Sequence, residues 1–409
     1  MVASGKRAVE RCDLLGVAPF SDSADFLYRP YLGPAHLAAI DQVAAWMREA
    51  GMTTRIDPAG NLIGRFGDGP KSLIIASHID SVHDAGRYDG PLGVMLGIEC
   101  VEALRGQALP FAIEVYAFGD EEGSRFPAPM LTSRAVCGQI EAAALEVADR
   151  AGVSLAEALA SANLSKDTFL DARRDPDGLI GYLEAHIEQG PVLEAEELAL
   201  GVVTAIAAQK RYEVLVEGVA GHAGTNSMSL RKDALTAAAE MVLAVEAVAR
   251  AGSGNVVATV GRMSVAPGAP NVVPGKVTFT VDVRAGIEGV RDLAAEAILN
   301  AIAEIAARRR IGASHSLVHD LPASPCDPAL MDVLSEAVAA TGQAPRRIVS
   351  GAGHDAMVFA RITPAAMLFI RCKDGVSHNP LESVTTQDAQ LALDAMVYFI
   401  KNIGKRGNV

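Results

Sequence analysis

The hydrophobic positions in the first part of the chain form short, uninterrupted runs. Residues 72–79 (SLIIASHI) and 111–119 (FAIEVYAFG) indicate buried parallel strands, because a strand covered on both faces has no polar alternation. Between them, residues 93–104 (GVMLGIECVEAL) have helical spacing. Strand, helix and strand in this order predict an α/β layered domain. Residues 141–164 are rich in alanine and predict one or two surface helices.

From about residue 207 the hydrophobic positions alternate instead, or repeat over long amphipathic segments. The order is strand, helix, two strands, helix and strand, which is typical of a ferredoxin-like α+β arrangement with an antiparallel sheet and helices on one face. The segments are 211–221, 231–252, 255–265, 276–285, 288–310 and 314–320.

The α/β pattern returns after about residue 322, with an expected helix at 327–341, a strand at 365–372 and a helix at 386–402. We therefore expect a discontinuous catalytic domain made of residues 1–206 and 323–409, with residues 207–322 inserted as a second domain. The length of 409 residues agrees, because single hydrophobic cores stop growing at roughly 250 to 300 residues.

Composition narrows the class of protein. Half of the residues are hydrophobic, 21% are charged, and the formal net charge is -13, which is typical of a globular protein and argues against a nucleic-acid partner. The N-terminus lacks the apolar core of a secretory signal, and no apolar run approaches the roughly 18 residues of a membrane span. We expect a cytoplasmic protein with no membrane partner.

The cysteines carry no sign of a disulfide framework or a zinc ribbon, because their number is odd and no C-x-x-C pair occurs. We interpret them as small buried apolar side chains. They are Cys12, Cys100, Cys137, Cys326 and Cys372.

Candidate chemistry first appears in the segment SHIDSVHDAGRYDGPLG, where a histidine ends a predicted buried strand and carboxylates follow in a glycine-rich loop. His78 and Asp80 are two residues apart on an extended chain and point to the same side. Asp80 can therefore accept a hydrogen bond from the far imidazole nitrogen and fix the tautomer of a metal-bound histidine. The carboxylate of Asp89 can bridge two cations.

A second cluster, GDEEGSRF, follows the predicted strand at 111–119. Asp120, Glu121 and Glu122 would repel one another unless cations neutralise them. Neighbouring residues project in different directions, so one glutamate can bind metal while the other acts as general base. His186 in EAHIEQGP and His378 in DGVSHNPLE supply two further candidate ligands.

Together these segments resemble the hydantoinase/carbamoylase branch of the aminoacylase-type dinuclear metallohydrolases. The resemblance covers nearly the whole chain, in the order H-x-D, Y-D-G-P, D-E-E-G-S-R-F, H-I-E-Q-G-P, G-H-A-G, P-N-V-V-P, G-H-D-A and S-H-N-P-x-E. It implies a zinc-exopeptidase-like, three-layer α/β catalytic domain with an inserted ferredoxin-like lid and dimerisation domain.

The resemblance also implies two divalent metal ions per subunit, with Glu121 as the general base. Asp89 would be shared by both ions, and Asp80 would support the site. The implied ligands are His78, Asp89 and His186 for one ion, and Asp89, Glu122 and His378 for the other. Such a set suits zinc or manganese, and also cobalt or nickel.

Substrate contacts are implied for Gln209, His222, Asn271 and Arg284 in the lid, and for the backbone of Gly351 and Gly353. Arg284 can hold a substrate carboxylate in a bidentate fork, and His222 can donate to the developing oxyanion. Related lids also reach the neighbouring subunit, so we expect a homodimer formed through the lid.

We therefore expect an amidohydrolase that cleaves a non-peptide C–N bond in a ureido or carbamoyl carboxylate, either an N-carbamoyl-L-amino acid or allantoate, with release of ammonia and CO₂. His186 favours this branch, because dipeptidase and deacylase relatives commonly have a carboxylate there. The alternatives are a dinuclear dipeptidase or N-acyl-amino acid deacylase, and a silent binding protein of the same fold.

Overall fold

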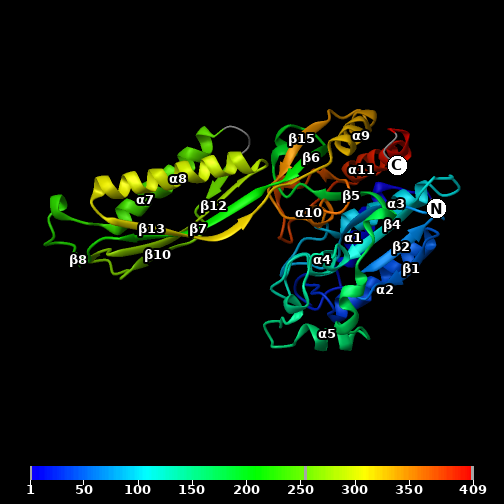
Figure 1. Cartoon of the computed structure of the whole chain (residues 1–409), viewed down its shortest axis with the longest axis horizontal. Coiled ribbons are helices and arrows are strands. Elements are labelled where there is room, and N and C mark those ends of the chain that lie inside the picture. Colours follow the sequence, from blue (N-terminus) through cyan, green and yellow to red (C-terminus); the bar gives the residue numbers. More distant parts are fainter. Residues whose placement is uncertain (1, 253–255, 407–409) are drawn as a thin grey trace. The chain divides into compact units, whose positions relative to one another are not determined.

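A computed structural model describes residues 2–252 and 256–406, which form two compact units (Figure 1). The first unit comprises Met1–Thr204, Cys326–Ile348 and Gly353–Val409, and the second comprises Ala205–Pro325 and Val349–Ala352. The expected division had placed 349–352 in the first unit. These residues group with the second because the carbonyl of Ser350 accepts from the amide of Ala207 at 2.9 Å.

A mixed sheet forms the centre of the first unit, although β14 and the last residues of β6 and β15 belong to the second unit. Its order is β1-β2-β4-β3-β5-β16-β6-β14, and β15 pairs with β6. The bounds are β1 Thr53–Ile56, β2 Leu62–Phe66, β3 Ser72–His78, β4 Ala112–Phe118, β5 Leu179–Ile187, β6 Leu200–Ile206, β14 Ser324–Pro325, β15 Arg346–Ser350 and β16 Ala365–Ile370. Strands β4, β3, β5 and β16 are parallel, and every residue in them is buried. Both faces of the central sheet are therefore covered, which makes a three-layer α/β unit.

Helices supply the covering layers. Helix α11 packs against α1, α3 and α9, and α3, α9 and α11 contact the central strands, whereas α10 contacts β5 and β16 and packs on α4. The α-helices are α1 Gly5–Leu15, α2 Pro34–Glu49, α3 Pro91–Ala103, α4 Leu131–Val136, α5 Leu155–Ser161, α6 Val192–Ala195, α9 Pro328–Ala340, α10 Ala356–Phe359 and α11 Thr386–Asn402. The 3₁₀ helices are η1 Ala142–Leu145, η2 Lys166–Ala172, η3 Pro176–Gly178, η5 Lys373–Gly375 and η6 Ile403–Arg406.

The helical prediction for 141–164 is right only in part. Helix α5 forms where Ser154 and Glu157 make a reciprocal capping box. The preceding residues form the short 3₁₀ helix η1, turns, and a bridge between Ala148 and Ser154. Alanine content alone does not distinguish the part that forms an α-helix from the part that forms a 3₁₀ helix and turns.

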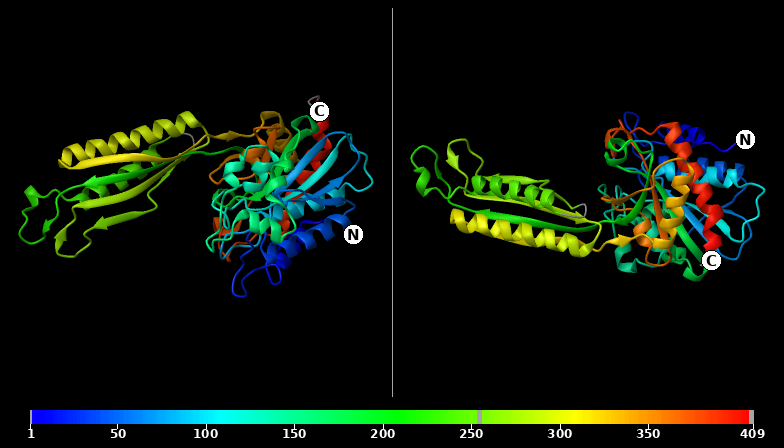
Figure 2. Two further views of the ribbon diagram at one scale, coloured as in Figure 1. Left: turned by 60° about the horizontal axis from the view of Figure 1, so that its bottom comes forward. Right: turned by 90° about the horizontal axis from the view of Figure 1, so that it is seen from above.

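The main sheet of the second unit is antiparallel and five-stranded, in the order β10-β12-β7-β13 with β9 also paired to β12. Helices α7 and α8 contact each other and lie on one face of this sheet (Figure 2). The bounds are β7 Ala208–Glu217, β8 Gly221–His222, η4 Met228–Leu230, α7 Ala234–Ala251, β9 Val257–Thr259, β10 Met263–Ala266, β11 Val272–Val273, β12 Lys276–Ala285, α8 Glu288–Arg309 and β13 Gly312–Leu321. This order confirms the predicted ferredoxin-like fold. The strand predicted at 255–265 is divided into β9 and β10, and its first residue lies outside the described residues.

Alternation along β12 separates the two faces of this sheet. Val281 and Val283 belong to the core with α7 and α8, whereas Asp282 and Arg284 are half-buried on the other face. The polar side chains of β12 thus gather on the face that carries no helix.

Two further expectations concern membrane-spanning helices and the state of the cysteine thiols. Within residues 2–252 and 256–406, no helix combines the length and apolar character needed to cross a lipid bilayer. All five cysteines are buried free thiols, which confirms their interpretation as apolar side chains.

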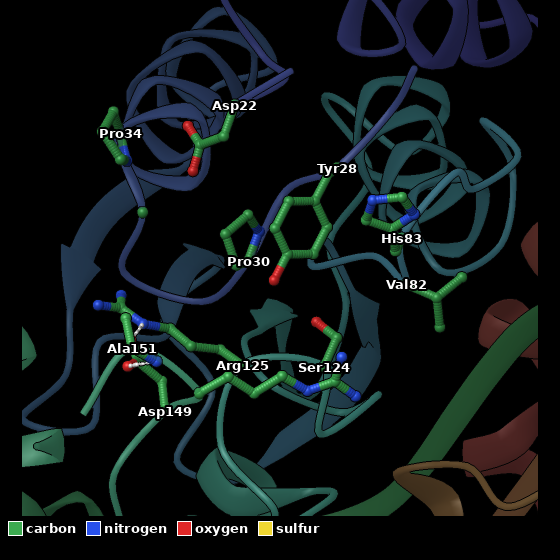
Figure 3. Close-up of a pocket in the computed structure, with 12 residues that line it drawn as sticks. Asp22, Tyr28, Pro30, Pro34, Val82, His83, Ser124, Arg125, Asp149 and Ala151 are labelled. Atoms are coloured by element: carbon green, nitrogen blue, oxygen red, sulfur yellow. Dashed lines mark hydrogen bonds and ion pairs between the residues drawn. The ribbon is translucent and has the colours of Figure 1, made fainter. Parts of the chain in front are cut away.

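A cavity of about 560 Å³ lies in the first unit (Figure 3). Tyr28 and His83 line it together with Arg125, whose Nε lies 3.2 Å from the carboxylate of Asp149. Arg125 Nη1 also donates to the carbonyl of Tyr31 at 2.6 Å. These contacts fix the loop that follows β4.

A buried charge cluster attaches α1 to α3. Glu99 on α3 is fully buried and accepts from Arg7 Nε at 2.6 Å, Arg11 Nη1 at 2.9 Å and the amide of Ser4 at 2.9 Å. The Arg11 guanidinium also lies 5.0 Å from the ring centre of Trp46. Removal of the carboxylate would leave buried guanidinium groups without a counter-charge.

We expect Glu99→Ala to lower the free energy of unfolding of the first unit by about 3 to 5 kcal/mol, because it breaks a buried ion pair. Trp46 is the single tryptophan of the chain, so urea denaturation followed by its fluorescence reports on this unit. Glu10→Ala is the matched control on α1, since its pair with Lys6 is exposed and is worth at most about 1 kcal/mol. Equal denaturation midpoints for the two variants would contradict this interpretation.

Candidate metal centre

Three parallel strands deliver polar side chains to one edge of the sheet. Strand β3 ends at His78, β4 is followed directly by the acidic residues 120–122, and His186 lies near the end of β5. The carboxyl ends of neighbouring parallel strands meet at the same edge, where α/β proteins form their sites. Residues from distant parts of the sequence are thereby brought together.

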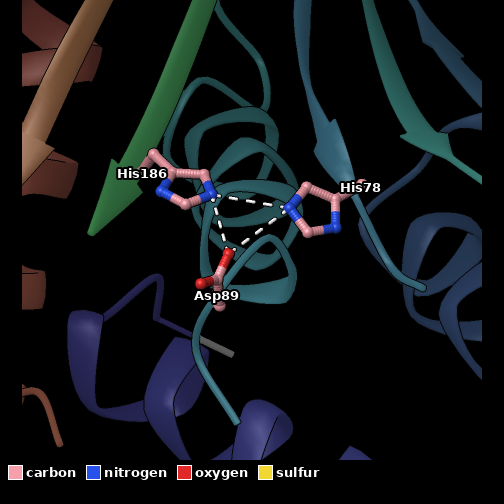
Figure 4. Close-up of side chains that lie close together, drawn as sticks. All are labelled: His78, Asp89 and His186. Carbon is pink, nitrogen blue, oxygen red and sulfur yellow. Dashed lines mark hydrogen bonds and ion pairs between the residues drawn. The ribbon is translucent and has the colours of Figure 1, made fainter. Parts of the chain in front are cut away.

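Asp89 lies at the centre of this group, in the loop between β3 and α3. Its Oδ1 is 3.1 Å from His186 Nε2 and 3.5 Å from His78 Nε2, and the two imidazole nitrogens are 3.5 Å apart (Figure 4). These three buried residues offer ligand atoms that can surround one metal ion.

The other oxygen of Asp89 faces a second group. Asp89 Oδ2 lies 3.5 Å from His378 Nε2, which is 3.4 Å from Glu122 Oε1. Asp89, Glu122 and His378 can also surround a metal ion. Each oxygen of one carboxylate therefore serves a different group, which is the arrangement needed to bridge two cations.

Glu121 is buried beside both groups. Its Oε2 lies 3.9 Å from His78 Nε2, and His78, Glu121 and Glu122 form a third possible set of ligand atoms. Burial, and the nearby charges of Glu122 and other carboxylates, raise the pKa of Glu121 well above its usual range, although His78 opposes this. A carboxylate with a raised pKa is a stronger base.

Asp80 connects the β3 and β4 ends of the site. Its carboxylate accepts from the amides of Glu121 and Glu122, each at 3.2 Å, and its Oδ1 lies 3.4 Å from His78 Nδ1. The same His78 nitrogen is 3.3 Å from the Asp80 carbonyl. Asp80 thus orients one imidazole and holds the backbone of the two glutamates.

Gly90 is required where α3 begins. Its φ of +85° is in the left-handed region, and a Cβ there would lie 2.5 Å from the His78 ring. Any larger residue would displace the imidazole from Asp89.

The donor set fits metal ions on electrostatic grounds. Burial and the charge of Asp89 raise the pKa of Glu122 to about 8, so that a carboxylate here is disfavoured when only protein groups surround it. Three carboxylates and three imidazoles form overlapping groups of possible ligand atoms, and divalent cations would relieve the repulsion among the carboxylates.

Two residues at this site were not singled out from the sequence. Gln189 Nε2 donates to Asp89 Oδ2 at 2.7 Å, and the hydroxyl of Ser377 donates to the same oxygen. Gln189 lies in the motif H-I-E-Q-G-P with His186, and Ser377 lies in S-H-N-P with His378. Their closeness in sequence to candidate ligands is the signal that could have identified them.

The residues expected to contact substrate lie mainly in the second unit, where they form two clusters. In the first, Asp282 accepts from Gln209 Nε2 at 2.5 Å and from Arg284 Nε at 2.8 Å, and it also pairs with Arg211. Arg284 Nη1 donates to the carbonyl of Gly351 at 2.6 Å. Gly353, expected to act together with Gly351, belongs to the first unit.

The second cluster pairs β8 with β11. His222 lies opposite Val272, and the amide of Ala223 donates to the carbonyl of Asn271 at 2.9 Å. His222 Nδ1 accepts from the amides of Gly224 at 3.0 Å and Thr225 at 3.3 Å. A ring nitrogen that accepts carries no proton, so Nε2 carries the ring proton and is the donor.

Comparison with known proteins identifies the family. The model of peptidase family M20/M25/M40 matches residues 74–402. A probable allantoate deiminase of Oryza sativa subsp. japonica is 39% identical, over 93% of this chain and 85% of that protein. An N-carbamoyl-L-amino acid amidohydrolase of Geobacillus stearothermophilus is 40% identical, over 88% and 90%.

Solved structures agree with these relatives. A hydantoinase/carbamoylase family amidase from Burkholderia ambifaria is similar with a TM-score of 0.89 and 33% identity, over 98% of both chains. The chain belongs to peptidase family M20/M25/M40, as a member of its hydantoinase/carbamoylase branch, which confirms the resemblance drawn from the sequence motifs.

Proposed function

We propose that this chain is a metal-dependent amidohydrolase that cleaves a non-peptide C–N bond in a ureido or carbamoyl carboxylate. The observation that carries the proposal is the Asp89 carboxylate, which presents one oxygen to each of two possible metal groups with Glu121 beside them. The names of the relatives, allantoate deiminase and N-carbamoyl-L-amino acid amidohydrolase, support the substrate class.

We propose two divalent cations, zinc or manganese, held by His78, Asp89, Glu122, His186 and His378. Bound cations supply Lewis acidity, which lowers the pKa of water and polarises the substrate carbonyl. Glu121 removes the proton of the attacking water and returns it to the leaving nitrogen. His222 donates its Nε2–H to the oxygen of the tetrahedral intermediate, and its backbone contacts keep that proton in place.

Glu121→Gln should abolish turnover, because the amide cannot accept the proton, while metal binding is retained. The measurement is ammonia release from allantoate and from N-carbamoyl-L-amino acids by metal-stripped protein reconstituted with Zn²⁺ or Mn²⁺. The variant is expected to lose at least about 10²-fold in kcat, which is the low end for general base catalysis. Activity on dipeptides or N-acyl amino acids, with none on ureido compounds, would show that the substrate class is wrong.

Arg284 is the proposed contact for the substrate carboxylate. It lines a cavity of about 660 Å³ on the face of the second unit that carries no helix, together with Arg211 and Arg262. Asp282 and Gly351 hold the guanidinium in position, and an oriented guanidinium can bind a carboxylate through two parallel hydrogen bonds.

Arg284→Lys should raise KM by about tenfold or more and change kcat less, because lysine keeps the charge and loses the planar fork. The measurement is steady-state kinetics on the ureido compound from which the wild type releases ammonia in the assay described above. Arg262→Lys is the matched control from the same cavity, since Arg262 is exposed and pairs with Glu213 at 2.9 Å. An unchanged KM in Arg284→Lys would exclude this contact.

We also propose a homodimer formed through the second unit. Within the described part of the chain, β13 pairs with β7 alone and ends the sheet, and it is exposed along most of its length. Leu317 and Val318 are large apolar residues on this strand, 51% and 62% exposed. An edge strand of ten residues with unpaired backbone groups can pair with a second copy.

The double variant Leu317→Asp, Val318→Asp should be monomeric, because it would bury charges at the pairing edge. Sedimentation analysis of the wild type should show a dimer. Leu14→Asp, at an exposed apolar position on α1, is the control and should remain dimeric. A dimer that survives the double variant would place the interface elsewhere.

A further inference from the structure

We propose that Glu382 is a positioning residue for the metal centre. It joins the loop that carries Asp89 to the loop that carries His378, and so supports mainly the group Asp89, Glu122 and His378, which takes two ligands from these loops. This inference rests on the metal binding proposed above.

The connection is made through backbone amides. Glu382 is buried, with 5% of its surface exposed, and its Oε1 accepts from the amides of Tyr88 at 2.7 Å and Asp89 at 3.1 Å. These residues are more than 290 positions apart in the sequence. A carboxylate that binds the amide of a ligand residue fixes the main chain from which the ligand projects.

Close packing limits the freedom of this contact. Gly86 lies against the Glu382 side chain so tightly that a Cβ at this position would be 2.3 Å from Cδ and 2.4 Å from Oε1. No real Cβ makes contacts of this length, so glycine is what allows the carboxylate to reach the Asp89 loop. A methyl group at Gly86 would displace the carboxylate without changing any ligand.

The loop of His378 depends on such contacts. His378 has a φ of +53°, which a residue other than glycine seldom adopts, and its side chain is 48% exposed. The chain turns at Asn379, whose carbonyl accepts from the amide of Glu382 at 3.0 Å. The next residues lead directly to Glu382, which is the anchor of this turn on the Asp89 loop.

The other metal group has a different support. His78 and His186 lie within β3 and β5, and hydrogen bonds of the parallel sheet fix their backbones. Both side chains are almost fully buried. Asp89 is shared by both groups. Loss of Glu382 should therefore weaken the site that contains His378 more, because Asp89 and His378 both come from the joined loops, and the site that contains His186 less, because only Asp89 does.

The test is a Zn²⁺ titration of metal-stripped full-length protein, with affinities from calorimetry and bound zinc counted by mass spectrometry after desalting. Wild type should bind two zinc ions per chain. Glu382→Ala should bind one with a smaller loss of affinity and the second about 10 to 100-fold more weakly. Glu382→Gln should retain two tight zinc sites, because the glutamine amide oxygen still accepts from both backbone N–H groups.

Gly86→Ala tests the same contact by displacing the Glu382 carboxylate, and it should weaken zinc binding in the same way. It keeps the inference testable if Glu382→Ala fails to fold. Asp57→Ala is the control, since Asp57 is a buried carboxylate that accepts from the amides of Ala59 and Asn61, each at 2.9 Å, in the β1–β2 connection. It should lose stability and keep both zinc ions.

Two tight zinc ions in both Glu382→Ala and Gly86→Ala would overturn the inference. Equal loss of zinc in Asp57→Ala would also overturn it, because the effect would then be general destabilisation. A wild-type protein that binds no zinc would instead refute the proposed zinc site, and this inference with it. The two failures are therefore distinguishable.

Discussion

Repulsion among buried acids is the constraint on which this structure depends. Asp80, Asp89, Glu121 and Glu122 lie together at one sheet edge, and the groups that face them are imidazoles, backbone amides, the Gln189 amide and the Ser377 hydroxyl. These groups offset only part of the cost of burying several negative charges together. The fold therefore holds a cluster that needs external positive charge, and the loops around it are arranged to keep that cluster from relaxing outward.

The parallel sheet makes this arrangement possible. It fixes His78 and His186 on neighbouring strands, whereas Asp89 and His378 come from loops that need their own supports. Gln189, Ser377 and Glu382 support the Asp89 loop with hydrogen bonds to its carboxylate or its amides. Asp80 holds the amides of Glu121 and Glu122 instead. Rigid strands thus set the position of one half of the centre, and hydrogen-bonded loops set the other.

Much of this could be predicted from the sequence, for identifiable reasons. The strand at 276–285 and the helix at 386–402 have the predicted bounds, because alternation and helical spacing are unambiguous there. The supporting contacts of Gln189 and the Asp282 cluster were not predicted, because they join side chains whose proximity depends on register and loop path. The residues 349–352 were assigned to the other unit, since four residues leave no periodic signal.

The connection between the units has a consequence for the history of the protein. The chain enters the second unit through Ala205 and Ile206 and leaves it through Ser324 and Pro325, and these residues pair side by side as β6 and β14. A segment whose two ends are adjacent can be gained, lost or exchanged as a single block, with a short turn closing the remaining chain. Recombination among related genes could therefore exchange residues 205–325 as one block and keep the candidate metal ligands of the first unit intact.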